Sequence, residues 1–137
     1  MNIIKKNMQM KHESVLSLLW IFVTLNYLYC DILTLMDSTI LKQFLTGTVE
    51  GMNITQNYLF WGAILMEIPI AMVLLSKLLT YKINRVSNMI AGLIKTVAMI
   101  LTLLVGKPTV YYSFFGTIEI LTTVFIIWYA WKWKEVK

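Results

Sequence analysis

Residues 58–106 read YLFWGAILMEIPIAMVLLSKLLT, then YKINR, then VSNMIAGLIKTVAMILTLLVG. Two long apolar runs therefore follow each other with only a short basic link between them. Each run reaches the roughly 20 residues that a helix needs to cross about 30 Å of hydrocarbon. Because so short a link leaves no room for a crossover, the two helices must be antiparallel neighbours. The stretch predicts a transmembrane helical hairpin.

Two further apolar runs flank this hairpin. The four spans are expected at about 15–36, 58–80, 86–106 and 109–131. They predict an all-α fold, an integral membrane four-helix bundle with up-down-up-down topology. Residues 1–14 form an N-terminal tail and residues 15–137 a single transmembrane domain. The first span contains Asp31 and has no small-residue cleavage site, so it is expected to remain as an anchor rather than to be cleaved as a signal peptide.

Composition excludes several classes of function. The chain has 137 residues, of which 58% are hydrophobic and only 14% charged, well below the roughly 25% charged residues of soluble domains. The net charge of +5 lies in the tails and one short loop, which argues against a nucleic-acid surface. With Cys30 and His12 as the only cysteine and histidine, no disulfide, haem, iron–sulfur or metal site and no other cofactor is expected.

The basic residues also predict the orientation. One side of the predicted bundle carries nine of them: Lys5, Lys6, Lys11, Lys77, Lys82, Arg85, Lys132, Lys134 and Lys137. The other side carries Lys42 and Lys107. Positive charge stays on the cytoplasmic side, so both termini are expected in the cytoplasm and the protein in a bacterial inner (plasma) membrane. The outer connection, residues 37–57, is expected to hold a small interfacial or lid-like helix.

Four ionisable residues lie inside the predicted spans, one on each helix: Asp31, Glu67, Lys95 and Glu119. The last three share roughly one depth near the bilayer centre. A charged side chain there costs about 2.5–3.5 kcal/mol or more if it faces lipid. All four are therefore expected to point into the bundle, with Asp31 nearer the outer end.

The neighbours of these residues support a common interior. Tyr27 shares a helical face with Asp31, and Tyr112 shares one with Glu119, so both tyrosines are further candidates for the site. For Tyr112, the interpretation as an interfacial anchor is favoured over a role in the site. Pro69 follows Glu67 by two residues and cannot donate to the carbonyl of Leu65, which predicts a bend and a free backbone acceptor.

Fully ionised, three carboxylates face one ammonium, a net interior charge of −2. Some of these carboxyl groups must then carry protons or meet a cation. The favoured hypothesis is a non-enzymatic protein that binds or transports a small cationic or amphipathic (hydrophobic) ligand, or protons, through this cluster. The alternatives are an enzyme that acts on a lipid or isoprenoid with Glu67 and Glu119 as acid and base, or a structural or accessory subunit. Partners are the lipid bilayer and such a ligand; the sequence leaves open a homo-oligomer.

Several segments resemble a family of small four-helix bacterial membrane proteins that is known only as a domain of unknown function. The segments are 19–23, 25–29 with Asp31, 65–76 (LMEIPIAMVLLS), 108–109, 111–112, 114–115, 118–120 and 128–131. The resemblance covers nearly the whole chain after the tail and implies the same fold and setting, but no activity. Lys95 does not belong to the family pattern. DoxX-like proteins and the sterol-isomerase and sigma-2-receptor group are similar in architecture only.

Overall fold

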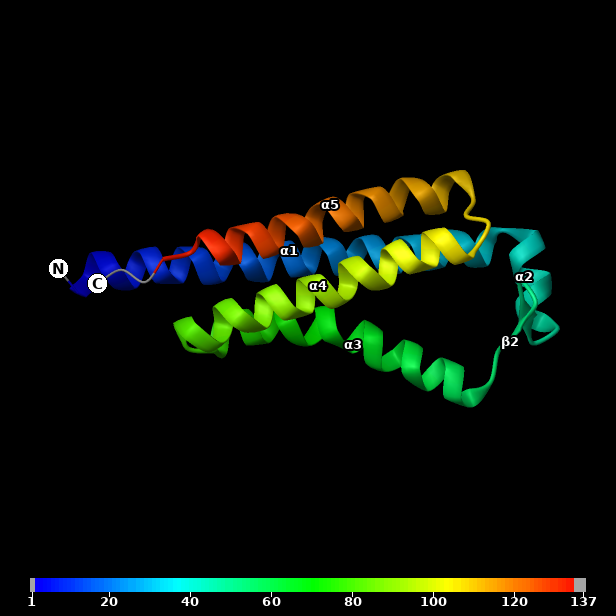
Figure 1. Ribbon diagram of the computed structural model, residues 1–137, viewed down its shortest axis with the longest axis horizontal. Coiled ribbons are helices and arrows are strands. Elements are labelled where there is room, and N and C mark those ends of the chain that lie inside the picture. Colours follow the sequence, from blue (N-terminus) through cyan, green and yellow to red (C-terminus); the bar gives the residue numbers. More distant parts are fainter. Residues whose placement is uncertain (1, 135–137) are drawn as a thin grey trace.

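The computed structural model describes residues 2–134 and is an elongated bundle of four long helices (Figure 1). The long helices are α1 (Asn2–Met36), α3 (Gln56–Leu78), α4 (Tyr81–Val105) and α5 (Val110–Lys132). Each is long and apolar enough to cross a membrane. The predicted all-α four-helix bundle is confirmed, and its four apolar helices make the chain a multi-pass membrane protein.

Helix α1 is longer than the expected span 15–36, which forms only its C-terminal part. It begins at Asn2, so the segment expected as a tail continues the helix. No glycine or proline interrupts residues 2–36, and nothing in this stretch stops helical hydrogen bonding. The helix ends one residue before Asp37.

The helices form a closed ring in the order α1, α3, α4, α5. Helix α1 packs against α3 and α5, and α4 packs most extensively against α5 and least against α3. The start of α1 and the end of α5 lie at one end of the bundle, called here the termini end (Figure 1). The link between α1 and α3 lies at the other, called the hairpin end. The topology is up-down-up-down, as predicted.

The link at the hairpin end contains α2 (Ser38–Leu45) and a two-stranded hairpin of β1 (Thr48–Val49) and β2 (Met52–Asn53). Asp37 caps α2, because its carboxylate accepts the backbone N–H groups of Thr39 at 2.9 Å and Ile40 at 3.4 Å. The short helix expected in this connection is thus present. The hairpin was not predicted; its turn residues Glu50 and Gly51 have φ of 50° and 81°, the left-handed pair of a tight hairpin turn.

Helix α3 bends near Pro69, and its first half diverges from the other helices (Figure 1). Proline removes one backbone donor and crowds the preceding turn, which is the expected cause of such a bend. The buried residues of α3 are Pro69, Met72 and Ser76, all after the bend. The half of α3 nearest the hairpin end therefore contributes no buried residue, and only the partly buried Met66 and Ile68 pack against the core before Pro69.

The core lies toward the termini end. Its buried side chains come from all four long helices and the residue after α5: Leu16, Trp20, Val23, Tyr27, Met72, Ala91, Ile126, Ala130 and Trp133. Beyond Cys30 of α1, Met99 of α4 and Gly116 of α5, toward the hairpin end, no residue of these helices is buried. One half of the bundle is packed and the other is hollow.

Helices α4 and α5 approach each other closely at two glycines. A Cβ on Gly92 would lie 2.7 Å from Ile127 Cγ1 and 3.2 Å from the Thr123 carbonyl oxygen. A Cβ on Gly116 would lie 2.6 Å from Met99 Cε. Small residues are what close helix contact in lipid requires. This pair is the most closely packed side of the bundle.

Candidate functional site

The central feature of the site is Glu119, near the middle of α5. Its side chain is only 1% exposed, and neither carboxyl oxygen has a hydrogen-bond partner among the described residues. A buried polar group without a partner is rare, because it loses its bonds to water and gains nothing in return. Glu119 therefore marks a place where a partner is missing.

Lys95 of α4 is also buried, at 3% exposed, but it does not supply that partner. Its Nζ lies 4.0 Å from the centroid of the Tyr27 ring and 3.6 Å from Met66 Sδ. The first contact is a cation–π interaction and the second a weak hydrogen bond. The Lys95 ammonium group thus contacts an aromatic ring and a sulfur atom, and it makes no hydrogen bond with Glu119.

These groups surround a cavity of about 680 Å³ between the four long helices. Its polar lining includes Tyr27, Cys30, Asp31, Lys95, Tyr112 and Glu119. Its apolar lining is contributed mainly by α3, with Leu59, Trp61, Gly62, Ala63, Leu65 and Met66. The volume falls in the range of 300–1,000 Å³ that is typical of small-molecule sites. We call this space the main cavity.

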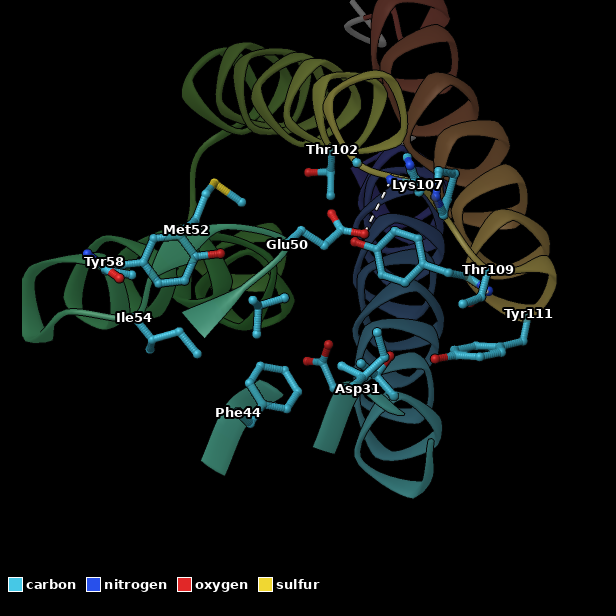
Figure 2. Close-up of a pocket in the computed structure, with 17 residues that line it drawn as sticks. Asp31, Phe44, Glu50, Met52, Ile54, Tyr58, Thr102, Lys107, Thr109 and Tyr111 are labelled. Carbon is cyan, nitrogen blue, oxygen red and sulfur yellow. Dashed lines mark hydrogen bonds between the residues drawn. The ribbon is translucent and has the colours of Figure 1, made fainter. Parts of the chain in front are cut away.

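A second cavity of about 280 Å³ lies beneath α2 and the hairpin (Figure 2). Asp31 and Tyr58 line it together with Thr102 and Tyr112, and the same four residues also line the main cavity. Figure 2 shows the carboxylates of Asp31 and Glu50 pointing into it from α1 and the hairpin. We call this space the vestibule, because its shared residues make it adjoin the main cavity.

Glu50 fastens the hairpin across the hairpin end. Its carboxylate accepts the backbone N–H of Lys107 at 3.3 Å, the dashed line in Figure 2. Its own N–H donates to Gln43 Oε1 of α2 at 2.9 Å. A Cβ on Gly106 would lie 2.9 Å from Glu50 Oε2, so the carboxylate rests directly on the link between α4 and α5. The hairpin is thereby tied to α2 on one side and to this link on the other.

The structure brings together five of the six predicted site residues. Asp31, Tyr27, Lys95, Tyr112 and Glu119 all line the main cavity, and the buried Tyr27 hydroxyl has no partner within the described chain.

Glu67 is placed differently. Its side chain lies exposed on α3 and lines neither cavity, so the expectation that it points into the bundle is wrong. From the bend onward, α3 packs through Pro69, Met72 and Ser76, and this buried set does not include Glu67.

The described residues do not form a metal-binding cluster. Within residues 2–134, no group of three or more histidine, cysteine, aspartate or glutamate side chains gathers closely enough to hold a metal ion.

One protein family matches the chain over its whole length. The model described as "Family of unknown function (DUF6326)" covers residues 1–137. The chain belongs to the DUF6326 family. The resemblance to a family without an assigned activity is thus confirmed. No curated protein and no solved structure matches this member of DUF6326.

The sequence reasoning missed a polar network in the core of this DUF6326 member. Asn88 Oδ1 accepts from Trp20 Nε1 at 2.6 Å and from Ser76 Oγ at 3.2 Å. Its Nδ2 donates to the Asn84 carbonyl at 2.9 Å and Asn84 Oδ1 at 2.7 Å, and Asn84 Nδ2 donates to the Ser76 carbonyl at 2.8 Å. The sequence feature that could have indicated this network is the pair Asn84 and Asn88, four residues apart, together with Trp20 in the first span.

Proposed function

We propose that this DUF6326 protein binds a small amphipathic cation in the main cavity, with the cationic group beside Glu119. The observation that carries the proposal is the state of Glu119: 1% exposed, without a hydrogen-bond partner, and lining a cavity of about 680 Å³. An isolated buried carboxyl group is stable only as the neutral acid or beside a cation. A ligand with a cationic group would supply the missing partner of the Glu119 carboxylate, and this ion pair would favour binding.

The charges and acceptors of the cavity favour a cation over an anion. Asp31 and Glu119 contribute two negative charges and Lys95 one positive charge, so the ionised lining has a net charge of −1. Lys95 already contacts the Tyr27 ring, whereas Glu119 has no hydrogen-bond partner within residues 2–134. Leu65 also lines the cavity, and its carbonyl lacks a helical donor because Pro69 has no N–H. We propose Glu119, with this carbonyl as a second acceptor, as the partner of an ammonium group.

Binding is favoured over conduction by the packing of the termini half. Trp20, Ser76, Asn84 and Asn88 are buried and bonded to each other across three helices. A satisfied buried network is rigid and leaves no polar group to solvate a passing ion. This supports a ligand site that is closed toward the termini.

We also propose that the protein lies in a bacterial inner membrane with the termini end in the cytoplasm. The nine basic residues on that side against two on the other support this orientation. Reporter fusions after residue 137 and at Thr46 in the connection test it: activity of a cytoplasmic reporter is expected only at residue 137, and the reverse result would contradict the orientation.

The binding proposal is tested with 2-phenylethylamine, a compact amphipathic cation, and phenylacetate as its anionic counterpart. The purified protein in lipid nanodiscs should bind the amine and not the acid, as measured by calorimetry. Glu119→Gln should weaken amine binding at least tenfold. Glu67→Gln is the matched control, since Glu67 lies at a similar depth but outside the cavity, and should change binding less than twofold.

Equal effects of the two glutamine variants, or preferential binding of phenylacetate, would contradict the proposal. Either result would shift attention to Lys95 as an anion partner or to a site outside the cavity.

The enzymatic alternative finds less support. It needs Glu67 and Glu119 together as acid and base, whereas only Glu119 lines the cavity. The accessory-subunit alternative has no specific observation in its favour.

A further inference from the structure

We infer that the natural ligand is a single-chain lipid amine that enters from the bilayer, beside the half of α3 nearest the hairpin end. Its ammonium group would lie at Glu119 and its alkyl chain along the first half of α3. This inference rests on the proposed binding function and adds the ligand class and the route of access.

Access from the termini end is closed. Trp20 and Asn88 meet at 2.6 Å between α1 and α4, and Ser17 Oγ donates to the Val73 carbonyl at 2.8 Å between α1 and α3. Leu16, Val23 and Ile126 fill the space around them and are fully buried. A ligand coming from that side would have to break a satisfied network in a packed core.

Access from the hairpin end is covered. The hairpin is held at Glu50 by the N–H of Lys107 and by Gln43 of α2, so α2 and the hairpin lie over the vestibule (Figure 2). The vestibule, at about 280 Å³, is also less than half as large as the main cavity at about 680 Å³. Entry of a large apolar ligand through the vestibule is therefore disfavoured.

The side formed by α3 is different. Between Gln56 and Ile68 the helix has no buried residue, and it diverges from the bundle before the bend at Pro69 (Figure 1). Gly62 lines the main cavity, and a Cβ built there would meet no atom within 4 Å. Helix α3 also packs against α4 less than any other neighbouring pair of the ring. The main cavity is thus least enclosed along this helix, which faces the hydrocarbon.

The lining along this side suits an alkyl chain. Leu59, Leu65 and Met66 of α3 and Ala98 and Met99 of α4 are apolar and lead toward the level of Glu119. Methionine side chains adapt to chains of different shape. A compact cation would leave this apolar surface without a partner. Each methylene of a chain would instead contribute to affinity through dispersion contacts with the lining.

The experiment measures n-alkylamines of 6, 8, 10, 12 and 16 carbons against nanodisc-embedded protein. At each length the signal of Glu119→Gln is subtracted, which cancels partitioning into the bilayer. Affinity should rise at least tenfold from hexylamine to dodecylamine. Gly62→Leu, which places a side chain in the open space, should weaken dodecylamine binding at least tenfold and weaken 2-phenylethylamine binding much less. Gly62→Ala is the matched control and should bind dodecylamine like the wild-type protein.

Leucine is a better helix former than glycine, so the Gly62→Leu chain is expected to fold, and its thermal unfolding should match that of the Gly62→Ala chain. A flat length series, or unchanged dodecylamine binding in Gly62→Leu, overturns the lipid-chain inference while the binding of 2-phenylethylamine stands. Loss of any dependence on Glu119 for every amine overturns the proposed function as well.

Discussion

The amide network near the termini end and the carboxyl group of Glu119 differ in how their buried polar atoms are bonded. Near the termini end, Asn84, Asn88 and Ser76 are fully buried, and their amide and hydroxyl groups bond to each other or to Trp20. Near the middle of α5, Glu119 is almost equally buried and has no hydrogen-bond partner among the described residues, while Lys95 contacts an aromatic ring and a sulfur atom.

This contrast separates a structural role from a functional one. A polar group that serves only to hold helices together has its hydrogen bonds made within the protein. A polar group that binds a ligand lacks such hydrogen bonds within the protein and lines a cavity. By that criterion the amide network is part of the scaffold, and the Glu119 cavity is the place to look for function. Four predictions probe the contrast, from the largest expected effect to the smallest.

The amide network should be the most sensitive position. Asn88→Ala removes the acceptor of Trp20 Nε1 and Ser76 Oγ and a donor to Asn84. It should lower the free energy of unfolding by about 2–4 kcal/mol, because several buried groups lose partners at once. Detergent-induced unfolding in bicelles measures this. Asn26→Ala, which removes only a local bond to the Phe22 carbonyl, should cost less than about 1 kcal/mol. Equal losses would mean that the network does not stabilise the fold.

The two glycines Gly92 and Gly62 should respond with opposite signs. Gly92→Ala places a Cβ against Ile127 and the Thr123 carbonyl, forcing α4 and α5 apart, and should destabilise by about 1–3 kcal/mol. Gly62→Ala meets open space and should be neutral or stabilise by up to about 1 kcal/mol. The same unfolding assay compares them. A destabilising Gly62→Ala would show that the hairpin half is packed more tightly than described.

Glu119 should behave unlike Asn88 although both are buried. Glu119→Met has a similar length and removes a carboxyl group that makes no hydrogen bond. It should raise the free energy of unfolding by about 1 kcal/mol, since an unpaired buried polar group is replaced by an apolar one. Differential scanning calorimetry of both variants checks the sign. A Glu119→Met chain destabilised as strongly as Asn88→Ala would place Glu119 in the scaffold instead.

The smallest effect is expected at the hairpin. Glu50→Ala removes the carboxylate that accepts the Lys107 N–H, a single partly exposed contact. Global stability should change by less than about 1 kcal/mol, but hydrogen exchange of the Lys107 amide should become faster. Glu13→Ala, on the α1 surface, serves as the control. Unchanged exchange at Lys107 would indicate that Glu50 does not fasten the hairpin.

Much of the fold was predictable, because bilayer thickness fixes the length of a span and charged links mark its ends. Asp37 likewise predicted the start of α2, since an aspartate at this position can accept the first free N–H groups of a helix. The inward placement of Lys95 and Glu119 followed from the cost of a charge in lipid.

Two features could not be predicted, for physical reasons. Asn84 was assigned to the link 81–85, yet α4 already begins at Tyr81, so Asn84 lies one turn before Asn88 on the same helix face. The cost of a charge in lipid predicted an inward position for Glu67 as it did for Glu119. The bend at Pro69, however, decides which face of α3 packs, and periodicity alone does not give the direction of the bend.

The most direct test of the central claim follows the carboxyl carbons themselves. The chain contains five glutamates, so ¹³Cδ labelling of glutamate gives few NMR signals, and that of Glu119 is assigned by its loss in Glu119→Gln. Titration with 2-phenylethylamine in nanodiscs should shift the Glu119 signal and leave those of Glu13 and Glu67 in place. A shift of Glu67 equal to that of Glu119, or no shift of Glu119 while the amine binds, would contradict the account.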